Sequence, residues 1–285
     1  MAKNIEIEKF ATIDAFVKSL NTRELNPAFK GSKDISSKIK GNKDFYKTNT
    51  YEESEELLTG GYREGLSVIQ SEKRVNNYGF IKRNIPTVGV VGFAPHVPNA
   101  IAGIPQSMVS VKARNQKSKI VNIIYNNSAS CSVTTSQLAV AGRHVLDVVA
   151  ILERQGYRVN VDILTTACTS TQVAMCFVRV KDALRIINPL KLAYILVHPS
   201  FFRRQGFRWI ETCPKITDET FSDGYGYPLI WLANKKNESE REWMKRHGLL
   251  PDGVFFTCYN EAVQNNAEEL IDIMGLCKKQ SMTTR

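Results

Sequence analysis

The hydrophobic positions of residues 119–164 change their period twice. Residues 120–125 form a nearly continuous apolar run, which is typical of a strand covered on both faces. Over residues 138–152 apolar side chains recur every three or four positions, which predicts an amphipathic helix that ends at Gly156. Residues 157–164 then alternate between apolar and polar side chains, as in a second strand. The pattern predicts a strand–helix–strand unit with parallel strands.

Alternating elements continue toward the C-terminus. Short apolar runs predict further strands, and helical spacing predicts one short and one long helix. The predicted strands cover residues 173–180, 190–197 and 253–258, with a candidate edge strand at 207–210, and the predicted helices cover residues 182–187 and 261–276. This alternation favours an α/β fold with a mostly parallel, Rossmann-like sheet that is flanked by helices.

The N-terminal part of the chain has a different character. Residues 1–50 are polar and rich in lysine, with one amphipathic stretch that predicts a helix near residues 11–20. A second helix is expected to begin at Thr50, because glutamates crowd its first turns, where negative charge stabilises a helix. We therefore expect an N-terminal basic and helical arm region over residues 1–83, and an α/β core with a C-terminal elaboration over residues 84–285.

Proline and glycine residues are frequent in residues 84–111. Residues 88–93 are expected to form a strand with close backbone approach, and the part after them a long irregular loop. Long loops in compact domains are often functional.

Charge narrows the classes of function. The chain carries a formal net charge of +10. Eight basic side chains in residues 72–119 oppose a single acid, and a second basic block spans residues 179–208. If the two blocks form one basic face, they favour nucleic-acid binding. The alternative is that they are parts of an ordinary solvated surface. No apolar run reaches the ~20 residues that a membrane span needs, so we expect no membrane partner.

The six cysteines are widely spaced. They contain no CxxC pair, which gives a structural zinc site little support. Cys176 and Cys258 lie in apolar runs, and we expect both to be buried. We expect no cofactor apart from a weakly bound divalent cation.

Polar side chains follow the first strand of the predicted core. The turn carries Asn126, Ser128 and Ser130 at the carboxyl end of that strand, where ligands usually bind in open α/β sheets. This spacing resembles the DxSxS motif of von Willebrand factor A domains, and the likeness covers residues 119–200. The resemblance implies that the three side chains, with residues from later loops, hold a divalent cation. Asn126 stands where that family has an aspartate, so the implied site is degenerate and weak. The alternative is a polar turn that caps the helix.

A second group of candidates follows the predicted strand at 190–197. His198 is expected near the serines of that turn, which raises the hypothesis of nucleophilic catalysis. The chain has no GxSxG elbow and no assignable acid partner, so a structural role for His198 is the alternative. Arg203 and Arg204 are candidates for bidentate binding of phosphate or carboxylate, or else exposed helix ends.

Aromatic side chains gather in a turn-rich segment further along the chain. Tyr225, Tyr227 and Trp231 are expected to anchor an interface or to stack on bases. Packing in the core is the alternative.

A wider resemblance covers most of residues 50–230. It rests on five segments, namely residues 51–58, 60–65, 104–108, 127–130 and 198–204. Together they resemble a family of uncharacterised phage proteins. The resemblance implies a phage or prophage origin, and we therefore expect the protein to be located in the host cytoplasm. It does not imply a reaction.

These features favour a non-enzymatic, phage-encoded interaction protein that forms a homo-oligomer and assembles with a host or phage protein complex. One version is an inhibitor of a host anti-phage defence complex, such as the nuclease-containing Gabija type. One alternative is a basic nucleic-acid-binding phage protein. The other is an enzyme that uses Ser128, Ser130, His198 and Arg203 in a pocket at the strand ends.

Overall fold

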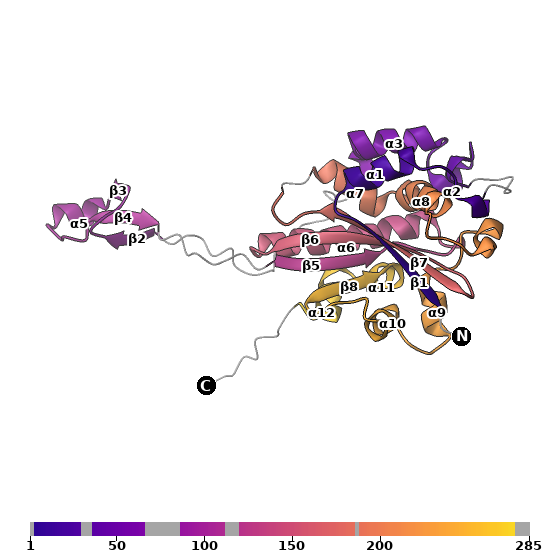
Figure 1. The fold of residues 1–285 in the computed structure, drawn as a ribbon. Coiled ribbons are helices and arrows are strands. Elements are labelled where there is room, and N and C mark those ends of the chain that lie inside the picture. The colour runs from indigo at the N-terminus through magenta and orange to yellow at the C-terminus, as the bar shows by residue number, and fades with distance from the viewer. Residues whose placement is uncertain (1–2, 30–35, 66–85, 112–119, 186–187, 277–285) are drawn as a thin grey trace.

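A five-stranded sheet forms the centre of the computed structural model, which describes residues 3–29, 36–65, 86–111, 120–185 and 188–276 (Figure 1). The strands lie in the order β1 (Asn4–Phe10), β7 (Gln172–Lys181), β6 (Arg158–Cys168), β5 (Ile120–Asn126) and β8 (Val254–Cys258). Three of the neighbouring pairs are parallel, and β6 and β7 form an antiparallel pair. The prediction of an α/β fold with a mostly parallel sheet is confirmed.

Helices cover both faces of this sheet. On one face the buried core includes side chains of α1 (Ile13–Thr22), α6 (Thr135–Arg154), α7 (Pro189–Val197), α8 (Phe207–Thr212), α11 (Tyr259–Gln264) and α12 (Ala267–Ile273). On the other face the core is completed by α9 (Leu229–Asn234) and α10 (Glu240–Arg246). Helix α3 (Tyr51–Gly60) packs on α7, and short helical turns connect these elements: η1 (Pro27–Phe29), η2 (Ser36–Lys38), α2 (Lys43–Tyr46), η3 (Phe201–Gly206) and η4 (Glu219–Asp223).

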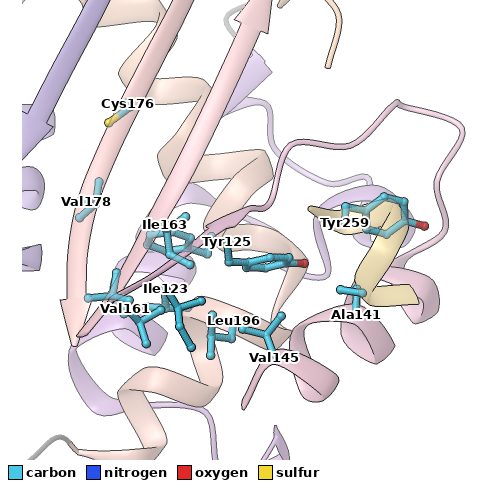
Figure 2. Close-up of a cluster of buried hydrophobic side chains, with 14 of the residues drawn as sticks. Ile123, Tyr125, Ala141, Val145, Val161, Ile163, Cys176, Val178, Leu196 and Tyr259 are labelled. Carbon is cyan, nitrogen blue, oxygen red and sulfur yellow. The ribbon is translucent and has the colours of Figure 1, made fainter. Parts of the chain in front are cut away.

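The alternation of side chains along the strands creates the two cores. Ile123 and Tyr125 of β5 face the layer that contains α6 and α7, whereas Ile124 between them faces α9 and α10. Figure 2 shows how Val145 of α6 and Leu196 of α7 pack against the first of these faces. Burying aliphatic and aromatic side chains on both faces supplies the main driving force for this fold.

The predicted β5–α6–β6 unit is confirmed. The side chain of Thr134 accepts a hydrogen bond from the Gln137 backbone N–H, and the Gln137 Oε1 accepts one from the Thr134 backbone N–H, which closes a capping box at the start of α6. Gly156 lies after the helix with φ of 86°, the left-handed conformation that glycine adopts without strain. Strand β5 pairs in parallel with β6 over its whole length, from Ile120 to Asn126.

Two predicted strands are helices. Residues 190–197 belong to α7, because the Asn188 side chain caps Leu190 and Pro189 occupies the first turn, both of which favour a helix start. This helix is buried on most sides, so its apolar run shows no helical period. Residues 207–210 belong to α8, and the predicted helix over 261–276 divides into α11 and α12 at a second cap, Asn266. Residues 182–185 form a turn, and the rest of that predicted helix lies outside the described residues.

The expectation of an N-terminal arm is wrong for the described residues. Strand β1 pairs in parallel with β7 from Asn4 to Phe10, and it forms one edge of the main sheet. Phe16 and Leu20 of α1 are buried in the core. Thr50 caps α3 as predicted, and Leu58 of that helix is also a core residue. The predicted boundary between residues 83 and 84 lies outside the described residues and stays a prediction.

A second, smaller sheet replaces the predicted irregular loop. Its antiparallel strands lie in the order β2 (Pro86–Gly89), β4 (Met108–Val111) and β3 (Ala94–Pro95), with the short helix α5 (Val97–Ile101) between β3 and β4 (Figure 1). Within the described ranges, no helix is both long and apolar enough to cross a membrane.

Candidate functional site

A buried polar cluster lies at the carboxyl end of β5, where the sequence predicted a site. Its central contact joins Asn126 to Glu240, the first residue of α10, with the Asn126 Nδ2 donating to Glu240 Oε2 at 2.6 Å. Cys258 of β8 is the register partner of Asn126, and its side chain also hydrogen-bonds the Glu240 carboxyl. Ser128 and Thr166 complete this group, which we call the Asn126 cluster. The cluster therefore ties the turn after β5, strand β8 and helix α10 together.

Burial dominates the electrostatics of this cluster. Glu240 is 3% exposed, and its desolvation raises the pKa of the carboxyl to about 7. The hydrogen bonds from Asn126 and Cys258 act in the opposite direction, because they stabilise the charged form. Burial likewise raises the pKa of the Cys258 thiol, so this cysteine is protonated at neutral pH.

The three side chains of the predicted cation site hydrogen-bond to different partners. The Asn126 Oδ1 accepts from the Ser128 backbone N–H at 3.1 Å, and the Ser128 Oγ accepts from the Thr166 backbone N–H at 2.6 Å. Ser130 is exposed, and its Oγ accepts from the Ser132 hydroxyl. Within the described ranges, no three His, Cys, Asp or Glu side chains group as metal ligands. The oxygens that a cation would need already serve as acceptors within the turn and to β6.

Replacing Glu240 with glutamine tests the role of the buried carboxyl. The unfolded carboxyl titrates near 4.5 and the folded one near 7, so between these values only the folded chain holds the proton. The free energy of unfolding of the wild type therefore contains a term that falls as pH rises from about 4.5 to 7. Glu240→Gln keeps an acceptor for Asn126 and removes this term, so it should raise stability at pH 8 by roughly 2–3 kcal/mol.

The measurement is urea unfolding of both chains from pH 4 to 8. The difference between the two curves isolates Glu240 from other titrating groups, such as His198, whose buried imidazole has its pKa lowered to about 4. His198 is present in both chains and cancels. A variant that is less stable at pH 8, with the pH slope unchanged, would contradict this electrostatic account.

His198 is not at the sheet edge. It follows helix α7 instead of a strand, and its ring lies between Tyr62 and Tyr194, with centroid distances of 4.8 and 5.3 Å. The His198 Nδ1 accepts from the Ser200 backbone N–H at 3.2 Å. These contacts join His198 to Tyr62, Tyr194 and Ser200, and not to Ser128 or Ser130.

Arg203 and Arg204 lie inside the protein. Arg203 is 2% exposed and donates to the carbonyls of Phe45 and Val133 at 2.7 and 2.6 Å. Arg204 is fully buried, stacks over the Tyr46 ring at 3.8 Å and donates to three backbone carbonyls. Guanidinium groups suit this task because their fixed fork satisfies several acceptors at once. The structure thus uses both side chains to hold the segment around α2 to η3.

The second basic block does not form one charged face. Lys181 is 4% exposed and pairs with Glu153 at 2.5 Å, and Arg179 pairs with Asp162. With Arg203 and Arg204 buried as well, much of the block's charge is neutralised or enclosed.

The predicted aromatic residues divide into two groups. Tyr225 packs inward, stacking on Phe207 at 4.6 Å and donating to the Glu211 carboxylate at 2.5 Å. Tyr227 is 54% exposed and stacks on Trp231 at 4.5 Å, with the planes 13° apart. The ammonium groups of Lys3 and Lys235 lie 5.7 and 3.4 Å from the Trp231 ring centroid. These last four residues form an aromatic and basic surface patch, which we call the Trp231 patch.

The strongest surface feature was missed by the sequence reasoning. Residues 86–111 contain no Asp, Glu, Lys or Arg, and within this stretch, which we call the uncharged module, no described side chain is buried. Among the described residues, seven of the twelve large apolar side chains that are exposed lie in it, and Val91, Phe93 and Ile101 are 81%, 73% and 83% exposed. The absence of charge over 26 residues was the available signal. Large exposed apolar patches are typical of protein or membrane interaction sites and of ligand-binding grooves.

Comparison with known proteins identifies a family whose description names no activity. A family model described as Domain of unknown function (DUF7192) matches residues 3–274. No curated protein and no solved structure matches the chain.

Proposed function

This chain belongs to the family described as Domain of unknown function (DUF7192), and we propose that it is a non-enzymatic protein that assembles with other proteins through the uncharged module. One observation carries the proposal: seven large apolar side chains of the module are exposed, and none of its described side chains is buried. A unit of 26 residues whose described side chains form no core gains little stability from its own contacts. A partner that covers Val91, Phe93 and Ile101 supplies the burial that the module lacks.

The sequence around the module indicates the chemistry of that partner. From residue 73 to 119 the chain has eight basic side chains and no acid, and none of these charges lies in the module itself. The complementary surface is apolar at its centre and acidic at its border. An anionic vesicle has a related chemistry, and binding to vesicles would count against a protein partner.

The biological setting is the finer part of the proposal. The resemblance of residues 50–230 to phage proteins supports a phage-encoded protein that acts in the host cytoplasm. We propose a host anti-phage defence complex as its target, which the protein binds and inhibits. The β5–turn–α6–β6 unit and the Asn126, Ser128 and Ser130 spacing support a relationship of the core to von Willebrand factor A domains.

Three serine substitutions in the module should abolish capture of the partner. We expect Val91→Ser, Phe93→Ser and Ile101→Ser, combined in one chain, to lower partner binding by at least tenfold, since an apolar hot spot loses much of its binding energy when truncated. The measurement is quantitative affinity capture from cells that express the tagged chain. A second measurement is the plating efficiency of phage on a host that carries the defence system, which the triple variant should fail to raise as the wild type does.

The matched control is Leu184→Ser. Leu184 follows β7 and is 74% exposed, so its replacement removes a comparable apolar side chain outside the module. Capture that is lost equally in the control, or retained in the triple variant, would contradict the proposal. Wild-type protein that pellets with anionic vesicles, and a triple variant that does not, would replace the protein partner by a lipid surface.

A second candidate function rests on the Trp231 patch. Exposed stacked aromatic rings beside ammonium groups are a platform for unpaired bases. Trp231→Ala should weaken binding of a single-stranded oligonucleotide about tenfold at low salt, and wild-type affinity should fall steeply as salt rises. Fluorescence anisotropy measures the affinity of the variant and the salt dependence of the wild type. Trp243→Ala is not a suitable control, because Trp243 is buried. Lys236→Ala, an exposed lysine outside the patch, is the control. Salt-independent or absent binding would eliminate this function.

A further inference from the structure

A groove of about 600 Å³ lies between helices α1, α3 and α7. Val17 of α1, Leu58 of α3 and Ile195 of α7 give it an apolar lining. The groove lies on helices that pack at the main sheet, and none of its lining residues belongs to the uncharged module. It is therefore a separate surface. Leu58 and Ile195 are largely buried by the fold itself and Val17 is half-buried, so an apolar ligand would cover the part of this lining that stays exposed.

Acidic side chains surround this apolar lining. Asp14 of α1 and Glu52, Glu55 and Glu56 of α3 line the groove, together with two lysines. Glu52 lies in the first turn of α3, where the helix dipole favours it, but Glu55 and Glu56 lie beyond that turn. In the described part of the chain, no ion pair engages Glu55 or Glu56.

The glutamates of α3 that line this groove are spaced so that they repel one another. Glu52 is three and four positions before Glu55 and Glu56, and like charges at these spacings on a helix repel. The chain as a whole is strongly basic, yet no cation of the described residues pairs with these two carboxylates. A basic and apolar ligand would relieve the repulsion and cover the apolar lining.

The chain itself contains such a ligand. The uncharged module exposes Val91, Phe93 and Ile101, and Lys82, Arg83 and Lys112 flank it in the sequence. We propose that the module of one copy docks in the α1–α3–α7 groove of a second copy. This inference rests on the proposed function, and it names a second copy of the chain as a protein that the module binds, beside the host complex proposed above. Reciprocal docking by two copies closes as a twofold dimer, because each copy then donates one module and receives one.

Sedimentation velocity of the full chain over a concentration series tests the inference. The groove variant is Glu55→Lys with Glu56→Lys, and the module variant is the triple serine chain. Wild-type protein is expected to dimerise, and each variant alone to self-associate at least tenfold more weakly. An equimolar mixture of the two variants should regain association, because the intact groove of one meets the intact module of the other.

Controls separate charge, folding and docking. Glu24→Lys with Asp272→Lys changes the net charge equally at exposed acids outside the groove, and it should dimerise as the wild type does. Glu55→Gln with Glu56→Gln keeps the side-chain size, so it should weaken association less than the lysine variant while retaining the helical circular dichroism. A helical spectrum of the lysine variant shows that the loss is not unfolding.

Three outcomes would overturn the inference: a monomeric wild type, variants that associate as the wild type does, or a mixture that associates no better than its components. If the wild type is monomeric but the triple serine chain still loses partner capture, self-docking fails and the proposed function stands. If the wild type is monomeric and the triple serine chain keeps its partner, both fail.

Discussion

Replacing Arg204 with methionine should destabilise the protein by about 3–5 kcal/mol, because buried backbone acceptors would lose a charged donor. The Arg204 guanidinium donates to the carbonyls of Ser37, Ile39 and Thr48 at 2.9, 2.6 and 3.0 Å. Methionine fills much of the volume but donates nothing, so these carbonyls would be desolvated without a partner. Urea unfolding at pH 7 measures the loss, with the m-value expected to be unchanged.

Two further variants sharpen this test. Arg204→Lys keeps the charge but lacks the planar fork, so we expect an intermediate loss. Arg185→Met removes an exposed arginine of the same sequence block and should change stability by less than about 0.5 kcal/mol. Equal stability of Arg204→Met and Arg185→Met would show that the buried guanidinium does not hold η3 to the α2 segment.

Gly142→Ala should be the most disruptive single-methyl change in α6. A Cβ at this position would lie 1.7 Å from the Leu196 carbonyl oxygen and 3.0 Å from the Val197 Cα, both in the backbone of α7. Helices α6 and α7 would have to separate, and we expect a loss of about 3 kcal/mol or more. Alanine otherwise favours a helix by about 1 kcal/mol over glycine, so any loss reflects the close approach of the helices.

Gly60→Ala is the matched control for that change. Gly60 is the last residue of α3, and nothing lies within 4 Å of an added Cβ there. Thermal unfolding should show an unchanged or slightly raised midpoint for Gly60→Ala and a clearly lowered one for Gly142→Ala. Equal midpoints would mean that α6 and α7 are further apart than the structure places them.

The elements that the sequence predicted best are those with a clear hydrophobic period. The β5–α6–β6 unit shows its strand run, its helical stripe and its glycine end directly in the residues. Helix α7 is buried on most sides, so its apolar residues carry no period, and its length fits a strand equally well. Strand β1 was missed although Ile5 and Ile7 alternate with Glu6 and Glu8, which is the period of a strand. The half-buried Glu8 carboxylate accepts hydrogen bonds from Arg23 and Trp209, which lie elsewhere in the chain and are not revealed by the local pattern.

The candidate site shows a different limit. The position of Asn126 at the carboxyl end of a strand follows from the chain pattern, but its partner Glu240 is 114 residues away. Likewise, the carbonyls that enclose Arg204 come from residues 37–48, and local charge alone makes that arginine look exposed. Such contacts depend on the packing of elements that are distant in sequence. The uncharged module could have been found, because the absence of charge over residues 86–111 is visible without a structure.

Site-specific photo-crosslinking in cells tests the central claim most directly. A photoreactive phenylalanine analogue replaces Val91 or Ile101 in the module, which are 81% and 83% exposed, and Leu184, which is 74% exposed, provides the control outside the module. If the module docks on a protein, illumination will give the same discrete protein adduct from positions 91 and 101, and none from position 184. Adducts of equal yield from all three positions, or no protein adduct from the module, would contradict it.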